Sequence, residues 1–237
     1  MKQLLIFALC LGMLSFTGCK QSGEEKTDKG TTETKKEEMN KDTGKTGAES
    51  AMPATGQLTQ PTMDDLGDPN ELAVISTEYG DIVVKFYADV APMHVANFKK
   101  LARAGFYDGT TFHRIIPQFV IQGGDPNSKD DDPFNDGMGG PPWNLKAEFN
   151  DRKHDKGILS MARSQDPNSA GSQFFICLSR ERTANLDHQY TVFGETVKGL
   201  DVVEKIGSMS RDPRKDAQKP AVVMKTVKVV KPAEVGM

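Results

Sequence analysis

The segment FHRIIPQFVIQGGD places one arginine, Arg114, among apolar side chains. A guanidinium is costly to remove from water unless it is paired, so Arg114 requires either a partner or a place at a solvent-accessible edge. Successive side chains of a strand point to opposite faces, which puts Arg114, Val120 and Gln122 on one face. Pro117 interrupts the strand pairing and can redirect Phe119. The segment therefore predicts a cationic donor beside an apolar surface.

A second run, GSQFFICLS, adds side chains of the same kinds. Alternation puts Gln173 and Phe175 on one face of this strand. If the two runs are neighbours in a sheet, they form a small apolar pocket bordered by one arginine and two glutamines, without a nucleophile. The residues alone leave a second interpretation open, in which Arg114 is a surface arginine paired with a carboxylate.

Other reactive residue types form no recognisable site. The histidines at 94, 113, 154 and 188 lack metal-ligand spacing, so we expect no metal and no cofactor. The acidic stretch 125–137 lacks the alternating ligands and terminal glutamate of a calcium loop, which favours a solvated loop. Ser172 is not followed two residues later by the glycine of a nucleophile elbow. Cys177 lies in the apolar run FFICL and is expected to be a small buried hydrophobe.

The first residues, MKQLLIFALCLGMLSFTGCK, predict export. Their apolar run is shorter than the roughly 20 residues needed to cross a bilayer core, so residues 1–18 are predicted to be a cleaved signal peptide. The ending resembles the lipobox of bacterial lipoproteins. It implies a lipidated Cys19 and an extracytoplasmic protein anchored to a bacterial membrane, either in the outer membrane and periplasm or at the cell surface. An ordinary signal peptide and an uncleaved anchor are the alternatives.

Composition divides the rest of the chain into a tether and one domain. The 237 residues carry a formal net charge of −3 and 37% hydrophobic residues, which is typical of a soluble protein and argues against a nucleic-acid partner. Residues 19–65 have few large apolar side chains and cannot offset the entropy of ordering, so we expect a disordered charged tether. Residues 66–237 are predicted to be the folded domain.

The domain shows about eight β-rich runs and only two helical patterns. Helices are expected over APMHVANFKKLARAGF, which has Pro92 near its start, and over GLDVVEKI. The predicted strands are a hairpin around Tyr79–Asp81, then 111–116, 119–122, 158–162, 174–178, 191–197 and a last strand in AVVMKTVKVV. This order does not fit alternating βαβ units. It favours an all-β fold, a closed eight-stranded antiparallel barrel with two helices.

Four long motifs, FHRIIPQFVIQGGDP, GILSMAR, GSQFFICLS and LDHQYTVFGETVKGLDVVEKI, resemble the cyclophilin family of peptidyl-prolyl cis–trans isomerases. The resemblance extends over nearly the whole domain. It implies a closed eight-stranded antiparallel barrel capped by two α-helices, with the active groove on an outer face. It also implies a role in folding extracytoplasmic proteins, and partners that are flexible polypeptides containing proline.

The resemblance implies a set of site residues. Arg114, Phe119 and Gln122 match the family's catalytic positions, and the arginine would donate to the prolyl nitrogen of the twisted amide. The implied substrate-binding residues are His113, Val120, Ala162, Arg163, Gln173, Phe175, Leu186 and Tyr190. Asn185 stands where many eukaryotic members have tryptophan, so we expect weak cyclosporin binding. Trp143 lies in another loop and is interpreted as packing.

We expect a monomer. The alternative function is a peptide-binding holdase that keeps the fold and the groove but has little isomerase activity. A surface scaffold is a third interpretation, which rests only on the tether.

Overall fold

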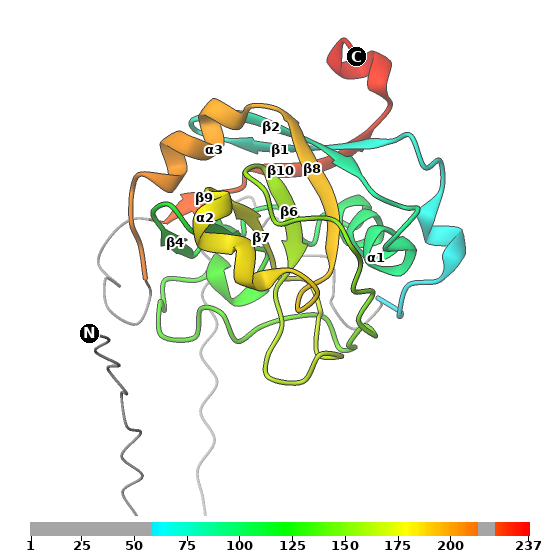
Figure 1. Ribbon diagram of the computed structural model, residues 1–237, viewed down its shortest axis with the longest axis horizontal. Helices are drawn as coiled ribbons and strands as arrows, with labels where there is room; N and C mark the ends of the chain where they lie inside the picture. The colour runs from blue at the N-terminus through cyan, green and yellow to red at the C-terminus, as the bar shows by residue number, and fades with distance from the viewer. Residues whose placement is uncertain (1–57, 213–220) are drawn as a thin grey trace, which may run out of the picture. The chain divides into compact units, whose positions relative to one another are not determined.

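The computed structural model describes residues 58–212 and 221–237 (Figure 1). The predicted signal peptide, Cys19 and residues 19–57 of the predicted tether lie outside the described residues. Within the described part, no helix is long and apolar enough to span a bilayer.

Eight strands form one antiparallel sheet in the order β10-β1-β2-β8-β6-β7-β5-β4. The hairpin predicted around Tyr79 joins β1 to β2, and Gly80 adopts φ +128° in its turn. The bounds are β1 Leu72–Thr77, β2 Gly80–Phe86, β4 Arg114–Ile116, β5 Val120–Gly123, β6 Ile158–Met161, β7 Phe174–Cys177, β8 Val192–Lys198 and β10 Thr226–Val230.

The expectation of a closed barrel is wrong, because the described pairings leave this sheet open between β4 and β10. Two strands predicted to be continuous are each split. The first halves, β3 (Thr111–Phe112) and β9 (Val222–Val223), leave the main sheet and pair with each other. The second halves, β4 and β10, stay in the main sheet as its two ends. The result is an open half-barrel with a small second ladder beside its ends.

Both predicted helices are present. Helix α1 (Pro92–Arg103) begins at the predicted proline and contacts β10, and α3 (Leu200–Gly207) contacts β2, β4 and β5. In Figure 1 they lie at different ends of the sheet. A short third helix, α2 (Arg180–Thr183), was not predicted, because four residues are too few to show helical periodicity. Within the described residues, the 3₁₀ segments η2 to η5 span Met63–Leu66, Pro126–Lys129, Ala184–Leu186 and Pro232–Val235.

The domain begins before the predicted boundary at residue 66. Segment η2 packs against α1, where Lys100 Nζ lies 3.1 Å from Asp65 Oδ2. The fully buried Lys99 Nζ donates to Leu66 O at 2.9 Å, to Asp68 O at 2.6 Å and to Glu71 Oε2 at 3.0 Å. Three acceptors compensate for burial of the ammonium group. Residues 58–65 are therefore part of the folded domain and not of a disordered tether.

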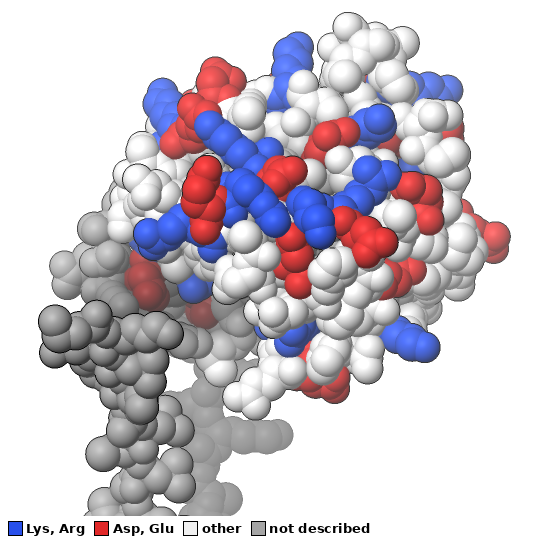
Figure 2. All heavy atoms as spheres, in the orientation of Figure 1, with Lys and Arg blue, Asp and Glu red and all other residues white. Residues whose placement is uncertain are grey.

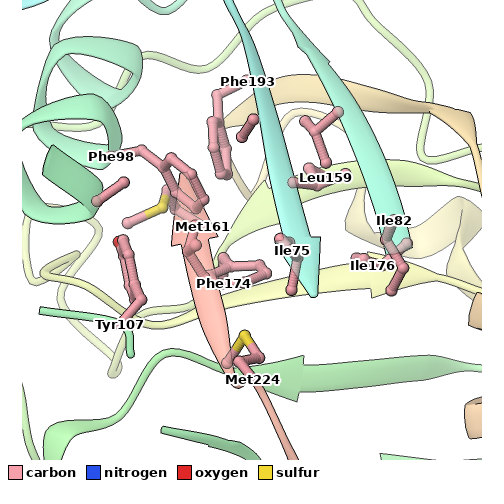
Figure 3. Packing of buried hydrophobic residues seen from close by; sticks show 14 of the residues in the cluster. Ile75, Ile82, Phe98, Tyr107, Leu159, Met161, Phe174, Ile176, Phe193 and Met224 are labelled. Atoms are coloured by element: carbon pink, nitrogen blue, oxygen red, sulfur yellow. The ribbon is translucent and has the colours of Figure 1, made fainter. Parts of the chain in front are cut away.

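The sheet has a hydrophobic cluster on each face. Alternation directs Ile115, Ile121, Leu159 and Ile176 into the main core, where aromatic side chains such as Phe98 pack between α1 and the sheet (Figure 3). The opposite parity directs Val120, Phe175, Cys177 and Val192 into a second, smaller cluster on the outer face. Cys177 is fully buried there, as predicted, and burial raises the pKa of its thiol to about 12. The predicted site residues lie at this outer face.

Candidate active site

Strand register places Arg114 in a row with three other side chains. Arg114 on β4 is opposite Gln122 on β5, Gln122 is opposite Phe175 on β7, and Phe175 is opposite Ser160 on β6. The tight turn after β4 redirects the chain, with Phe119 N donating to Ile116 O at 3.0 Å and Gln118 at φ 60°. The two runs, whose adjacency was the condition for the predicted pocket, are therefore neighbours in the sheet.

A chain of side-chain amides orients the Arg114 guanidinium. Its Nη1 donates to Gln122 Oε1 at 3.1 Å, and Gln122 Nε2 donates to Gln173 Oε1 at 3.1 Å. Gln173 Nε2 in turn donates to Gly139 O at 2.8 Å. Each glutamine accepts on one side and donates on the other, so the whole chain has a single orientation. We call these contacts the amide relay.

Arg114 forms no ion pair within residues 58–212 and 221–237. The interpretation of Arg114 as a surface arginine paired with a carboxylate is therefore wrong for the described structure. Arg114 is half-buried and keeps part of its surface in water. A cation held by neutral amides retains its capacity to donate to an incoming ligand.

A cavity of about 140 Å³ lies beside this guanidinium. Phe119, Phe175 and Leu186 supply apolar wall, and Arg114 and Gln122 form a polar edge. This cavity, called the small pocket below, is lined by Arg114, Phe119, Val120, Gln122, Ala162, Arg163, Phe175, Leu186 and Tyr190. Nine of the eleven predicted site residues thus lie around one space of the size of a small ring.

The remaining two predicted residues, His113 and Gln173, line a larger hollow of about 610 Å³ next to it. Arg114, Gln122, Ala162 and Arg163 line both spaces. Burial lowers the pKa of His113 to about 4, so its ring is neutral near pH 7. Neither ring nitrogen of His113 has a hydrogen-bond partner among the described residues. His113 does not line the small pocket.

Two loops close the far side of the small pocket. Arg163 stacks on Tyr190, with its guanidinium carbon 4.6 Å from the ring centre. The same guanidinium donates to Gln189 O at 2.9 and 3.0 Å and to Ser164 O at 2.9 Å. Ala162 N donates to Gln173 O at 2.9 Å, which connects this wall to the amide relay. Arg163 thus braces the pocket through its side chain.

A buried polar cluster beneath Phe175 was not predicted. The His154 ring stacks on Phe175 at 6.1 Å between ring centres, and its Nε2 lies 3.0 Å from Ser160 Oγ. Its Nδ1 lies 3.1 Å from Asp187 Oδ1. The Arg180 guanidinium, at 2.7 and 2.9 Å, holds the pKa of the Asp187 carboxyl well below its usual range. The polar Ser160 in an otherwise apolar strand was the only signal of this cluster in the sequence.

The acidic stretch 125–137 is only partly the solvated loop that was predicted. Asp130, Asp131 and Asp132 are exposed, but Asp125 is fully buried and accepts from the amides of Asn127 at 2.8 Å and Gly139 at 3.2 Å. A Cβ at position 139 would lie 2.2 Å from Asp125 Oδ1, so only glycine fits there. Trp143 donates to Asn97 Oδ1 at 2.9 Å and packs against the core, as predicted, while also lining the larger hollow.

Residues 72–229 match the family model of the cyclophilin-type peptidyl-prolyl cis-trans isomerase/CLD. The chain belongs to the cyclophilin family. A probable peptidyl-prolyl cis-trans isomerase of Brucella abortus (strain 2308) is 40% identical over 163 residues, which cover 67% of this chain and 82% of the relative. A peptidyl-prolyl cis-trans isomerase of Synechococcus elongatus is 47% identical over 141 residues, covering 59% of this chain and 90% of that protein.

A cyclophilin crystal structure from Cryptosporidium parvum, determined in the presence of the dipeptide Ala-Pro, matches with a TM-score of 0.59. It is 32% identical and covers 68% of this chain and 99% of its own. Cyclophilin membership and the named relatives support peptidyl-prolyl cis–trans isomerase activity for this chain. Among the described residues, no serine, cysteine or lysine lines the small pocket, which is consistent with a reaction in which a bond rotates and none is broken.

Proposed function

We propose that this cyclophilin isomerises X–Pro bonds through Arg114, with the proline ring held in the small pocket. The barrier of about 18–20 kcal/mol arises because rotation breaks the amide resonance. As the bond twists, the prolyl nitrogen gains a localised lone pair. A fixed guanidinium donates to that nitrogen better in the twisted state than in the planar state, which is differential binding of the transition state.

The observation that carries this proposal is the position of Arg114. Its guanidinium stands at the edge of the small pocket, bonded to Gln122 and free of any ion pair among the described residues. Phe119, Phe175 and Leu186 supply apolar contact for a proline ring. The test is the cis-to-trans rate of a proline tetrapeptide with the domain from Leu58 onward. Acceleration by the wild type that is lost in Arg114→Ala supports the proposal, and no acceleration by a folded wild type contradicts it.

We propose that cyclosporin binds this cyclophilin only weakly. Asn185 is exposed beside the buried Leu186, and its carbonyl accepts from Gln189 Nε2 at 2.8 Å. An asparagine offers neither an indole N–H nor an aromatic surface to the macrocycle. We expect a dissociation constant above the micromolar range by calorimetry, with Asn185→Trp binding more tightly. A nanomolar constant for the wild type would contradict this prediction.

We also propose that the protein works outside the cytoplasm as a monomer, anchored by lipid on Cys19. Support comes from the sequence of residues 1–19, in which an apolar run ends in TGC. Intact-mass analysis of the protein extracted from membranes is expected to show a chain that begins at Cys19 and carries acyl mass. Cys19→Ser should leave an unprocessed or soluble chain. A mature form that begins elsewhere, or has no acyl mass, would contradict the proposal.

A holdase function is the second candidate. Phe134 and Met138 are each 77% exposed, and Met138 lines the larger hollow. Exposed apolar side chains beside a groove suit capture of flexible segments. This candidate predicts peptide binding without acceleration of isomerisation.

A further inference from the structure

The outer edge of β4 is held by a residue from a distant segment. Strand β4 is three residues long and pairs along its inner edge with β5. On its outer edge, Ile115 N donates to Arg211 O at 2.6 Å, and Arg211 N donates to Ile115 O at 2.9 Å. Arg211 lies just after α3 and forms an isolated antiparallel bridge to the residue that follows Arg114. The backbone of Arg114 is therefore fixed from both edges.

The side chain of Arg211 also contacts the backbone of the residue before Arg114. Its Nη1 donates to His113 O at 3.4 Å, and its Nη2 lies 3.4 Å from Asp136 Oδ2. The side chains of Arg211 and Asp136 are only 7% and 5% exposed. Arg211 lines neither the small pocket nor the larger hollow. It contacts the backbone on both sides of Arg114 without reaching the space that a substrate would occupy.

Asp136 connects the contacts of Arg211 to the amide relay. The next residue, Gly137, donates its amide to Asp125, and so does Gly139 at 3.2 Å. Gly139 O is also the last acceptor of the relay that begins at Arg114. The loop 136–139 therefore contacts Arg211, which bonds the backbone around Arg114. The same loop also accepts a hydrogen bond from Gln173, which is linked to the Arg114 guanidinium through Gln122.

The buried pair does not look like a source of stability. Burial raises the pKa of Asp136 to about 6, even though Arg211 opposes the shift. A carboxylate whose pKa rises on folding favours the folded state only when protonated, so near pH 7 the charged form costs stability. A buried pair with defined partners instead fixes the arrangement of the two segments that it joins.

We propose that Arg211, with Asp136, is a positioning residue that sets the placement of Arg114 for catalysis. This inference rests on the proposed role of Arg114 in isomerisation. Removing the Arg211 side chain leaves the Ile115 bridge but releases His113 O and the Asp136 loop. The guanidinium of Arg114 then samples more than one position relative to the small pocket.

The first test compares kcat/KM for a proline tetrapeptide in wild type, Arg211→Ala, Asp136→Ala and the double variant. We expect each single change to lower kcat/KM about tenfold, mainly through kcat, because small misplacements of a catalytic group are costly. The double variant should lose no more than Arg211→Ala alone, since the Asp136 side chain acts through Arg211. Arg211→Lys should recover part of the loss. The matched control is Arg182→Ala, which removes an exposed arginine with no hydrogen bond or ion pair among the described contacts.

The pH profile gives a readout that a purely structural role would not change. The charges that act on Asp136 come from Arg211, just after α3, and from Asp125, Asp130 and Asp132 in its own loop. Three further titratable or charged residues line the larger hollow together with Asp136: His113, Arg114 and Asp212. The pKa of His113, about 4, lies below the range of interest. Wild-type kcat/KM should fall as pH decreases through about 6, where Asp136 takes a proton, and Asp136→Ala should lack this inflection.

The NMR signal of the Arg114 side-chain Nε–Hε group reads the placement directly. One sharp signal is expected in wild type and Arg182→Ala, and a broadened or doubled signal in Arg211→Ala. An unchanged signal with kcat/KM within about twofold of wild type would overturn the inference. Asp136→Ala serves the same test if Arg211→Ala does not fold. A folded wild type without acceleration would refute the proposed function, while the NMR signal would still test the contact.

Discussion

Arg114→Ala is expected to lower kcat/KM for a proline tetrapeptide by about 10²–10³-fold, the usual cost of removing one donor to a transition state. The folded structure should be unaffected. Arg114 is half-buried, and its only described side-chain hydrogen bond is to Gln122. Its removal therefore leaves only the Gln122 side-chain oxygen without this donor, and that oxygen can accept a hydrogen bond from water instead. The measurement is the cis-to-trans rate, beside the thermal unfolding midpoint of each variant.

Arg114→Lys tests whether catalysis needs the planar guanidinium group or only its positive charge. Lysine carries the same charge but lacks the planar fork that can bond Gln122 and a ligand at the same time. We expect this variant to remain close to Arg114→Ala in activity. If Arg114→Lys kept more than half of the wild-type rate, a point charge near the pocket would suffice and the role assigned to the amide relay would be wrong.

Phe175→Ala is expected to reduce both activity and stability. Phe175 is nearly buried, packs edge-on against Tyr190 at 5.7 Å and forms one wall of the small pocket. Removing a buried aromatic side chain costs about 3–5 kcal/mol of unfolding free energy. Loss of its contact with the proline ring should lower kcat/KM by a further 10- to 100-fold, roughly. Denaturant unfolding and the isomerisation rate of the folded fraction measure the two effects.

Phe174→Ala is the matched control for this change. Phe174 is the preceding residue but points into the main core, where it packs against Phe98 at 5.4 Å and Tyr107 at 5.8 Å. Its loss should cost comparable stability. Because Phe174 does not line the small pocket, the folded fraction should keep kcat/KM near the wild-type value. Equal activity losses in the two variants would show that Phe175 acts only through stability.

Sequence reasoning was most successful where a local rule determines the outcome. The two-residue period of a strand placed Arg114, Val120 and Gln122 on one face, and the structure has them around one pocket. The same rule separated Phe174 from Phe175. Pro92 and the apolar spacing after it predicted α1 to within a residue at its start.

The features that were missed depend on contacts between distant segments. His154 meets Asp187 and Ser160 only in the folded sheet. The charges of Asp125 and Asp136 suggested a solvated loop, but glycine amides and Arg211 compensate for their burial. The ends of the sheet also depend on long-range pairing, since β3 and β9 leave it to pair with each other. Local composition contains no information on which of these partners will meet.

Charges of both signs are interspersed over the face seen in Figure 2, so surface charge gives no further guide to a binding partner on that face.

The most direct test of the central claim is exchange NMR of an Ala-Pro tetrapeptide at equilibrium, with a substoichiometric amount of the domain. Wild type should produce cross-peaks between the cis and trans signals, because it interconverts the isomers while they are bound. Arg114→Ala should still shift the peptide signals, since the small pocket remains, but should produce no cross-peaks. A folded wild type that shifts the peptide signals without exchange cross-peaks would contradict the account and favour a peptide-binding holdase.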